Sequence, residues 1–388
     1  MVSTHFRSLL GLLLVAGCTS TPLGENDEPK TCGASSVPLT KLPAEVGTLL
    51  YESTAERSAT ALDFNPIVPD ELWVTLRDPE TNLPCTQLQG SGCAALEGRV
   101  VVIEGASTDA PSATLEKDDN AWHFMRRPTS IAFGVEGLFS TCGETRTANY
   151  EDEVADFSGP TLWDSDPAIF GQPATGMQNG KHIDMLHETP FCMGLAHEQA
   201  NVFWAFNGQI GALDRYDFHT PHEVGGSDHA DGELFRYAEG LVSRVAGVPS
   251  DMAYDAESGL LYIADTGNHR IARLDPSTAT LGSENDSHET MAQNVNMLGA
   301  VLEDFATCLG RPSGLVLHQG FLIATDNETS QILVYDRDGT LVMRAETGLT
   351  AGTLSGIAIG SDGRAFCSDL RTGDVFVLGA ELFSTAMF

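Results

Sequence analysis

Short apolar runs alternate with polar turns along most of this 388-residue chain. The clearest example is residues 260–275, where two runs rich in β-forming residues flank the polar stretch 265–270. The glycine and asparagine in that stretch tolerate positive φ, so the pattern predicts a β-hairpin. Residues 249–255, followed by a turn at 257–259, predict a further strand. Strands joined by short turns in this way are typical of one blade of a β-propeller.

Similar runs recur along the chain and predict six blades. The segments that carry them are residues 59–104, 128–141, 190–216, 249–275, 312–336 and 354–378. Six copies of one antiparallel unit predict an all-β fold, a six-bladed β-propeller with four-stranded blades. Most blades begin roughly 60 residues apart, against roughly 40–45 for a typical four-stranded blade, so long loop insertions are expected. We expect a strand near residues 46–51 to close the ring by joining the last blade.

The fourth of these segments resembles the NHL repeat. Residues 261–271, LYIADTGNHRI, carry the resemblance together with the preceding strand, which begins near Pro249. The resemblance implies an NHL-type propeller. The insertion-rich region 159–275 is also similar to bacterial NHL-repeat lipoproteins that have no assigned reaction.

The resemblance does not extend to the site residues of enzymes with this fold. The NHL-type amidating lyases place metal-binding histidines where inner strands begin, and here those positions hold Ser130, Met193, Asp251, Gly314 and Gly356. Gluconolactonases and regucalcin-like proteins hold an axial metal with Glu, Asn and Asp, and no matching inner-strand glutamate is present. Nucleophile-elbow, P-loop and dinucleotide-binding motifs are missing as well, so no organic cofactor is expected.

The N-terminus has the pattern of an exported lipoprotein. A charged start is followed by the apolar residues 8–15 and then by Val-Ala-Gly-Cys, which ends at Cys18. The apolar run is too short to span a membrane, which takes about 20 residues. We therefore predict a signal peptide over 1–17, a flexible tether over 18–43 that starts at the lipidated Cys18, and a propeller over 44–388. The protein is expected at the cell envelope, on the outer membrane if the cell has two membranes.

Charge and cysteine content narrow the class of partner and the compartment. The formal charge of −33 disfavours nucleic acid, because phosphates would be repelled. An acidic surface favours solubility, and bound divalent cations would neutralise part of it. Eight cysteines are present, and export favours disulfides between those that are not lipidated. The expected pairs are Cys85 with Cys93, Cys142 with Cys192 and Cys308 with Cys367, which leaves Cys32 over.

Two groups of histidines are candidates for chemistry. The first group, residues 181–188, precedes the third inner strand and is expected at the mouth of the central channel. His182, Asp184 and His187 are ligand types suited to zinc or another transition metal. His187 or Glu188 would act as a general base. The alternative is a hydrogen-bonded histidine pair that packs an insertion onto the disc.

The second group, residues 217–232, follows a third strand, so topology predicts that it lies on the opposite face or at the rim. Asp228 and Asp231, with their neighbouring glycines, are typical of an oxygen-rich calcium loop, although the spacing of an EF-hand is absent. A solvated acidic turn is the alternative. The two histidine groups are expected to form separate sites unless the loop folds across an edge.

Two classes of function fit these observations. The first is a binding module for a small molecule or a protein at the cell envelope, since loops on a rigid scaffold commonly carry binding residues. The second is a metal-dependent hydrolase or lyase that uses His182, Asp184 and His187, where a metal would lower the pKa of a bound water towards 7. A divalent metal, zinc or calcium, is the expected cofactor.

Overall fold

The structure is a computed structural model, and it describes residues 37–41, 48–54, 57–78, 98–148, 156–171 and 180–379. The predicted signal peptide, Cys18 and nearly all of the tether lie outside these residues, as do Cys32, Cys85 and Cys93. Within the described ranges, no helix combines the length and the apolar character that a membrane span requires.

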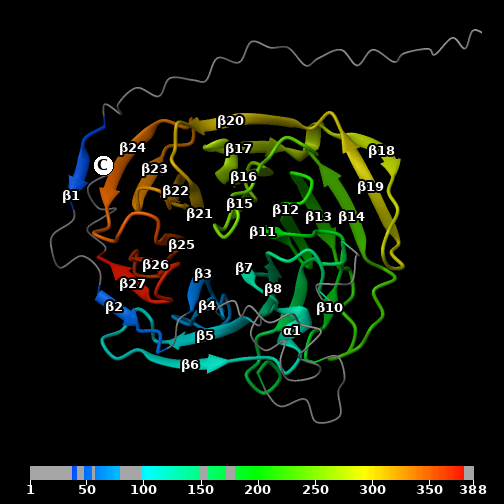
Figure 1. Cartoon of the computed structure of the whole chain (residues 1–388), viewed down its shortest axis with the longest axis horizontal. Helices are drawn as coiled ribbons and strands as arrows, with labels where there is room; N and C mark the ends of the chain where they lie inside the picture. The colour runs from blue at the N-terminus through cyan, green and yellow to red at the C-terminus, as the bar shows by residue number, and fades with distance from the viewer. Residues whose placement is uncertain are drawn as a thin grey trace, which may run out of the picture. The chain divides into compact units, whose positions relative to one another are not determined.

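Six antiparallel blades are arranged around a common axis, which confirms the predicted propeller (Figure 1). The first strand of each blade contacts the first strands of both neighbouring blades, so these six strands surround the axis. Blade 1 consists of β3 (Ser58–Phe64), β4 (Leu72–Arg77), β5 (Gly98–Glu104) and β6 (Ser112–Glu116). Blade 2 consists of β7 (Pro128–Phe133), β8 (Leu138–Gly143), β9 (Thr161–Asp164) and β10 (Asp184–Met185). Blade 3 consists of β11 (Cys192–Gln199), β12 (Val202–Asn207), β13 (Ala212–Asp217) and β14 (Glu233–Tyr237).

The remaining blades follow the same order. Blade 4 consists of β15 (Met252–Asp255), β16 (Leu260–Asp265), β17 (Arg270–Asp275) and β20 (Val301–Thr307). Blade 5 consists of β21 (Pro312–His318), β22 (Phe321–Asp326), β23 (Gln331–Tyr335) and β24 (Leu341–Glu346). Blade 6 consists of β25 (Leu354–Ile359), β26 (Ala365–Asp369), β27 (Val375–Leu378) and β2 (Thr48–Tyr51). Helical structure among the described residues is limited to α1 (Ala121–Phe124) and the short 3₁₀ turns η3 (Thr266–Asn268) and η4 (Pro276–Thr278).

The N-terminal strand β2 closes the ring, as the sequence predicts. It pairs antiparallel with β27, with Thr48 opposite Val377 and Leu49 opposite Phe376, and so completes blade 6 with residues from the other end of the chain. An additional strand, β1 (Leu39–Lys41), pairs parallel with β24 on the outside of blade 5.

The long insertion of blade 4 extends blade 3, which the sequence does not predict. Between β17 and β20 the chain forms a hairpin of β18 (Thr280–Glu284) and β19 (Gln293–Leu298). β19 pairs parallel with β14, with Leu234 opposite Asn294, so blade 3 becomes a six-stranded sheet (Figure 1, upper right). The hairpin therefore covers the backbone edge that β14 would otherwise expose.

Blade 4 shows how the sequence specifies its strands. The predicted hairpin is confirmed: Leu261 lies opposite Leu274 in β16 and β17, and both side chains are buried. At the turn, the Asp265 carboxylate accepts hydrogen bonds from the Asn268 amide at 2.9 Å and from Arg270 Nε at 2.7 Å. Apolar residues thus fix the register and Asp265 stabilises the turn that connects the strands.

Apolar side chains between adjacent blades form the core. Between blades 3 and 4, Trp204, Phe206, Leu261 and Ile263 pack together, and each has 0% exposure. Burying an aromatic side chain of about 150–250 Å² at about 25 cal/mol/Å² contributes about 4–6 kcal/mol before conformational entropy is subtracted. Hydrogen bonds join strands mainly within a blade, so this packing holds one blade against the next.

One of the predicted disulfides is present, and another is wrong. Cys142 on β8 is bonded to Cys192 on β11, which links blades 2 and 3 across 50 positions of sequence. Cys308 is disulfide-bonded, but not to Cys367, which is a free thiol. Cys367 is 1% exposed because β26 directs it into the core between blades, where it packs as a small apolar residue.

Candidate functional site

A cavity of about 270 Å³ lies on the propeller axis and is lined by the first strands of all six blades. Its walls are mostly aliphatic and include Leu62, Ile131 and Leu315. The ionisable residues along it are Asp63, His197, Asp251 and Tyr254, and the described residues that line it include no lysine or arginine. The cavity therefore combines an apolar wall with two carboxyl groups that have no lysine or arginine among the described lining residues.

Asp63 enters the cavity near the end of β3. Its two carboxylate oxygens accept hydrogen bonds from the backbone N–H groups of Phe64 and Phe133, both at 2.8 Å. Burial raises the pKa of Asp63 to about 6, even though these two N–H groups favour the charged form. The second of these hydrogen bonds also joins the inner strands of blades 1 and 2.

Asp251, directly before β15, is the second carboxyl group in the cavity. Its Oδ1 accepts a hydrogen bond from Ser130 Oγ at 3.2 Å, and Ser130 Oγ accepts one from the Leu195 N–H at 3.0 Å. Burial raises the pKa of Asp251 to about 7, and the negative charge of Asp63 adds to the rise. Among the described residues, neither carboxyl group forms an ion pair, so the cavity would favour a ligand that donates hydrogen bonds or carries positive charge.

The first histidine group lies elsewhere. Residues 184–185 form β10, the outermost strand of blade 2, because the chain pairs Asp184 with Leu162 on β9 before it enters blade 3. None of His182, Asp184, His187 and Glu188 lines the axial cavity. The expectation of a site at the channel mouth is therefore wrong: the segment completes one blade before the next inner strand begins.

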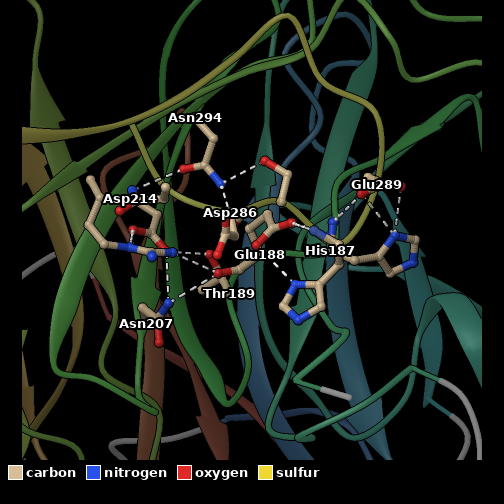
Figure 2. A network of polar contacts seen from close by, with 12 residues as sticks. His187, Glu188, Thr189, Asn207, Asp214, Asp286, Glu289 and Asn294 are labelled. Carbon is tan, nitrogen blue, oxygen red and sulfur yellow. Dashed lines mark hydrogen bonds and ion pairs between the residues drawn. The ribbon is translucent and has the colours of Figure 1, made fainter. Parts of the chain in front are cut away.

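His187 and Glu188 contact the tip of the β18–β19 hairpin (Figure 2). His187 Nδ1 lies 3.0 Å from Glu289 Oε1, which also accepts the His187 backbone N–H at 2.6 Å. In the reverse sense, Glu188 Oε2 lies 3.0 Å from His288 Nδ1, and Glu188 Oε1 accepts the His288 N–H at 2.5 Å. Two crossed carboxylate–histidine pairs thus hold the insertion of blade 4 against residues 187–188.

Burial tunes the protonation of these residues. It lowers the pKa of the His187 ring, with Glu289 opposing the shift, and it raises the pKa of the Glu188 carboxyl, with His288 opposing. The His187 ring also stacks on Phe157, with a centroid distance of 3.7 Å and an interplanar angle of 10°. These contacts fit the alternative interpretation of the sequence, in which hydrogen-bonded histidines pack an insertion onto the disc.

A buried polar network adjoins these pairs (Figure 2). Asp214, at 0% exposure, accepts hydrogen bonds from Thr189 Oγ1 at 2.6 Å, from Asn207 Nδ2 at 2.8 Å and from Arg236 Nε at 2.7 Å. Arg236 also donates to the Glu188 carbonyl at 2.8 Å. The buried carboxylate of Asp214 is therefore paired and hydrogen-bonded, as a buried charge must be, and the network fixes the backbone at Glu188.

The two histidine groups meet, contrary to the expectation of separate sites. The loop between β13 and β14 turns back towards β10, where the His222 N–H donates to the Ile183 carbonyl at 3.0 Å and the Gly225 N–H donates to the His182 carbonyl at 2.8 Å. As a result, the rings of His182, His222 and His229 gather, with potential ligand nitrogens all within 4.8 Å of one another. The loop folds across the edge of the blade, which alternating strand connections alone do not predict.

Asp184 orients one ring of this histidine cluster and does not join it as a member. Its Oδ1 lies 2.9 Å from His229 Nδ1. Burial disfavours the charged ring, but the hydrogen bond and the charge of Asp184 raise the pKa of His229 above its ordinary value. Asp228 and Asp231 are exposed and accept backbone N–H groups of Ala230 and Thr220, both at 3.2 Å. These two aspartates therefore stabilise turns within the loop.

Several of these residues have no local sequence signal. His288 and Glu289 reach residues 187–188 from an insertion of another blade, about 100 positions away. Asp63 has a weak signal, because it is a charged residue inside a run that otherwise forms a buried inner strand. An ionisable side chain at such a position is a candidate for a site on the axis.

Comparisons with known proteins agree with this architecture. A family model of the NHL repeat matches residues 247–274. No protein among those with curated descriptions matches the sequence significantly. The fold is similar to that of an auxiliary nutrient binding protein from Bacteroides ovatus, with 11% identity over 89% of this chain and 76% of that chain and a TM-score of 0.50. A calcium-binding protein named regucalcin from Agrobacterium tumefaciens has 13% identity over 88% of this chain and 96% of that chain, with a TM-score of 0.46.

At such identities the likeness concerns the fold. The family match covers β15, β16 and all but the last residue of β17 in blade 4, and five further antiparallel blades complete the ring. This chain is a six-bladed β-propeller whose fourth blade matches the NHL repeat.

Proposed function

We propose that this protein is a binding module of the cell envelope that holds a small, positively charged organic ligand in its axial cavity. In this proposal it is exported and anchored through an acylated Cys18. The observation that carries the ligand class is the pair Asp63 and Asp251, which face one cavity without an ion-pair partner among the described residues.

Burial opposes ionisation of both carboxyl groups and raises the pKa of Asp63 to about 6 and that of Asp251 to about 7, where the charge of Asp63 adds to the effect. An ammonium or guanidinium group placed between them would offset both effects, because a nearby opposite charge favours the charged form of each carboxyl. The aliphatic walls from Leu62, Ile131 and Leu315 would contact the hydrocarbon part of such a ligand.

A binding role is favoured over turnover by the position of the histidines. A metal-dependent hydrolase or lyase at the channel mouth would need His182, Asp184 and His187 around the cavity, and none of them lines it. A protein of similar fold is named an auxiliary nutrient binding protein. Capture of a nutrient at the envelope is a use that suits the proposed site.

Thermal-shift and calorimetric titrations with organic amines, neutral sugars and carboxylates test the ligand class. We expect amines to bind the wild type and to lose at least tenfold in affinity in the double variant Asp63→Asn/Asp251→Asn. The control Glu257→Gln removes an exposed carboxylate that does not line the cavity, and its affinity should match that of the wild type. Binding that survives in the double variant, or a lack of response to every amine, would contradict the axial site.

Labelling of cells with a palmitate analogue tests the anchor separately. We expect the wild-type chain to carry the label and to fractionate with membranes, and Cys18→Ala to lose both properties. A Cys18→Ala chain that stays labelled would contradict the anchor and leave the axial site unaffected.

A further inference from the structure

We infer that His182, His222 and His229 form a binding site for a divalent transition metal ion of the zinc type, which fastens the 218–232 loop of blade 3 to the outer edge of blade 2. The site is separate from the axial cavity, because none of the three histidines lines that cavity. The inference therefore stands apart from the proposed ligand-binding function.

The first support is the convergence of three imidazole rings. Ring centroids lie 4.9 Å apart for His182 and His222, 5.1 Å for His222 and His229, and 6.1 Å for His182 and His229. A tetrahedral zinc ion with bonds of about 2.0–2.1 Å holds its ligand nitrogens about 3.3 Å apart. The nitrogens here lie within 4.8 Å of one another, so small side-chain rotations would bring them to that spacing.

In two of the three rings, Nδ1 already contacts a neighbouring oxygen atom, which leaves Nε2 for a metal ion. His229 Nδ1 is paired with Asp184, and His222 Nδ1 lies 2.6 Å from the Glu223 carbonyl. Each contact fixes a tautomer with hydrogen on Nδ1 and leaves Nε2 as the coordinating atom, the arrangement that metal-bound histidines usually show. Asp184 would then be a positioning residue that acts through His229.

The third support is an unsatisfied atom. His222 Nε2 is buried, and no group among the described residues forms a hydrogen bond with it. Buried polar atoms nearly always have a partner, and a lone one calls for an explanation. A metal ion coordinated by Nε2 supplies one.

The backbone holds this geometry in place without the ion. Hydrogen bonds from His222 and Gly225 to residues 182–183 fix the loop against blade 2. His182, at 2% exposure, stacks on Phe124 of α1 with a centroid distance of 3.9 Å. A Cβ at Gly226 would lie 2.7 Å from His222 Nδ1, so glycine there lets the loop pass close to the ring.

The ligand chemistry selects the class of metal. Imidazole nitrogens suit zinc, copper, nickel and cobalt, whereas calcium and magnesium prefer oxygen ligands. The Asp184 carboxylate, whose Oδ1 lies 2.9 Å from His229 Nδ1, places negative charge beside the site and favours a cation there. Three protein ligands leave a fourth position for water.

Metal titration of tag-free, full-length protein after chelator treatment tests the inference. We expect one Zn²⁺ per chain by elemental analysis, a Co²⁺ visible spectrum of tetrahedral type, and a rise in Tm with Zn²⁺ but not with Ca²⁺. The double variant His222→Ala/His229→Ala should lose all three responses. Both residues lie on a partly exposed loop, and circular dichroism would verify that the variant is folded.

Three single variants locate the ion. Asp184→Asn should weaken Zn²⁺ binding by 10–100-fold, the usual effect of losing an outer partner of a metal-bound histidine. His219→Ala, on the same loop but in a different group with Asp217 and Glu233, should bind like the wild type. His187→Ala should also bind like the wild type. Loss of the ion in either of the last two variants, its retention in the double variant, or no uptake by the wild type would overturn the assignment.

Discussion

His187 Nδ1 lies 3.0 Å from the carboxylate of Glu289, a residue 102 positions further along the chain and in the insertion of another blade. The neighbouring pair, Glu188 and His288, repeats the contact with acid and base exchanged. The paired strands β14 and β19 hold the hairpin along blade 3, and these two pairs hold its tip. The β18–β19 hairpin, an insertion of blade 4, therefore joins blades 3 and 4 in addition to the packing of their core residues.

The Glu289 carboxylate should govern how firmly the hairpin tip is held. Glu289→Ala removes the acceptor of the buried His187 backbone N–H and of its ring. A buried donor left without a partner costs about 1–3 kcal/mol, so urea unfolding should show a loss of that order. Amide hydrogen exchange should accelerate over residues 285–292. The control Glu284→Ala changes an exposed residue of the same hairpin. Equally fast exchange over residues 285–292 in this control variant would contradict a specific role for Glu289.

Asp251 should make stability fall as pH rises. Its folded-state pKa of about 7 lies above the ordinary value of 3.8, so the folded protein binds this proton more tightly than the unfolded chain does. The stabilisation is fully present below about pH 4 and is lost as pH rises to about 7, by at most about 4 kcal/mol. Chemical unfolding of the wild type and of Asp251→Asn across this range measures the difference.

The difference between the two proteins isolates this carboxyl group from others that titrate. We expect Asp251→Asn to be relatively more stable at pH 7.5 than at pH 4.5. The control Asp109→Asn, at an exposed turn after β5, should show no such trend. Parallel curves for the wild type and Asp251→Asn would contradict the raised pKa.

The cysteines should differ sharply in reactivity and in their effect on stability. The Cys142–Cys192 disulfide spans 50 positions, and in the chain-entropy model such a loop contributes about 4 kcal/mol. The double variant Cys142→Ser/Cys192→Ser should lose stability of that order.

Burial raises the pKa of the Cys367 thiol to about 12, so iodoacetamide should label Cys367 only after unfolding. Rapid labelling of Cys367 in the folded protein would contradict its place in the core.

Gly194 should be indispensable where blade 3 meets blade 4. A Cβ at this position would lie 1.9 Å from the Ser250 carbonyl oxygen, a backbone atom that cannot rotate away. Gly194→Ala should therefore cost about 3 kcal/mol or more, because the inner strands must separate. Gly379→Ala, where a Cβ meets no atom within 4 Å, is the matched control. Equal Tm values for the two variants would show that the blades adjust to the added methyl group.

Local pattern was sufficient to predict the blades. Leu261 and Leu274 lie opposite each other because the turn at Asp265, which is encoded within a few positions, joins two short apolar runs in one register. The closing strand β2 is also predicted, near residues 46–51, and it pairs with β27 of the last blade. Information of this kind lies in short segments, where an apolar run bounded by turn residues predicts a buried strand.

Only the tertiary structure decided which chemical groups meet. Asp184 and His229 lie 45 positions apart, and they pair because the 218–232 loop crosses the blade edge and bonds to residues 182–183. The charge of Asp63 acts on Asp251 because the inner strands of blades 1 and 4 face one axis. Such contacts depend on how long loops pack against finished blades. How a long loop packs depends on many contacts with residues that are distant in the sequence. A local pattern of residues therefore does not predict it.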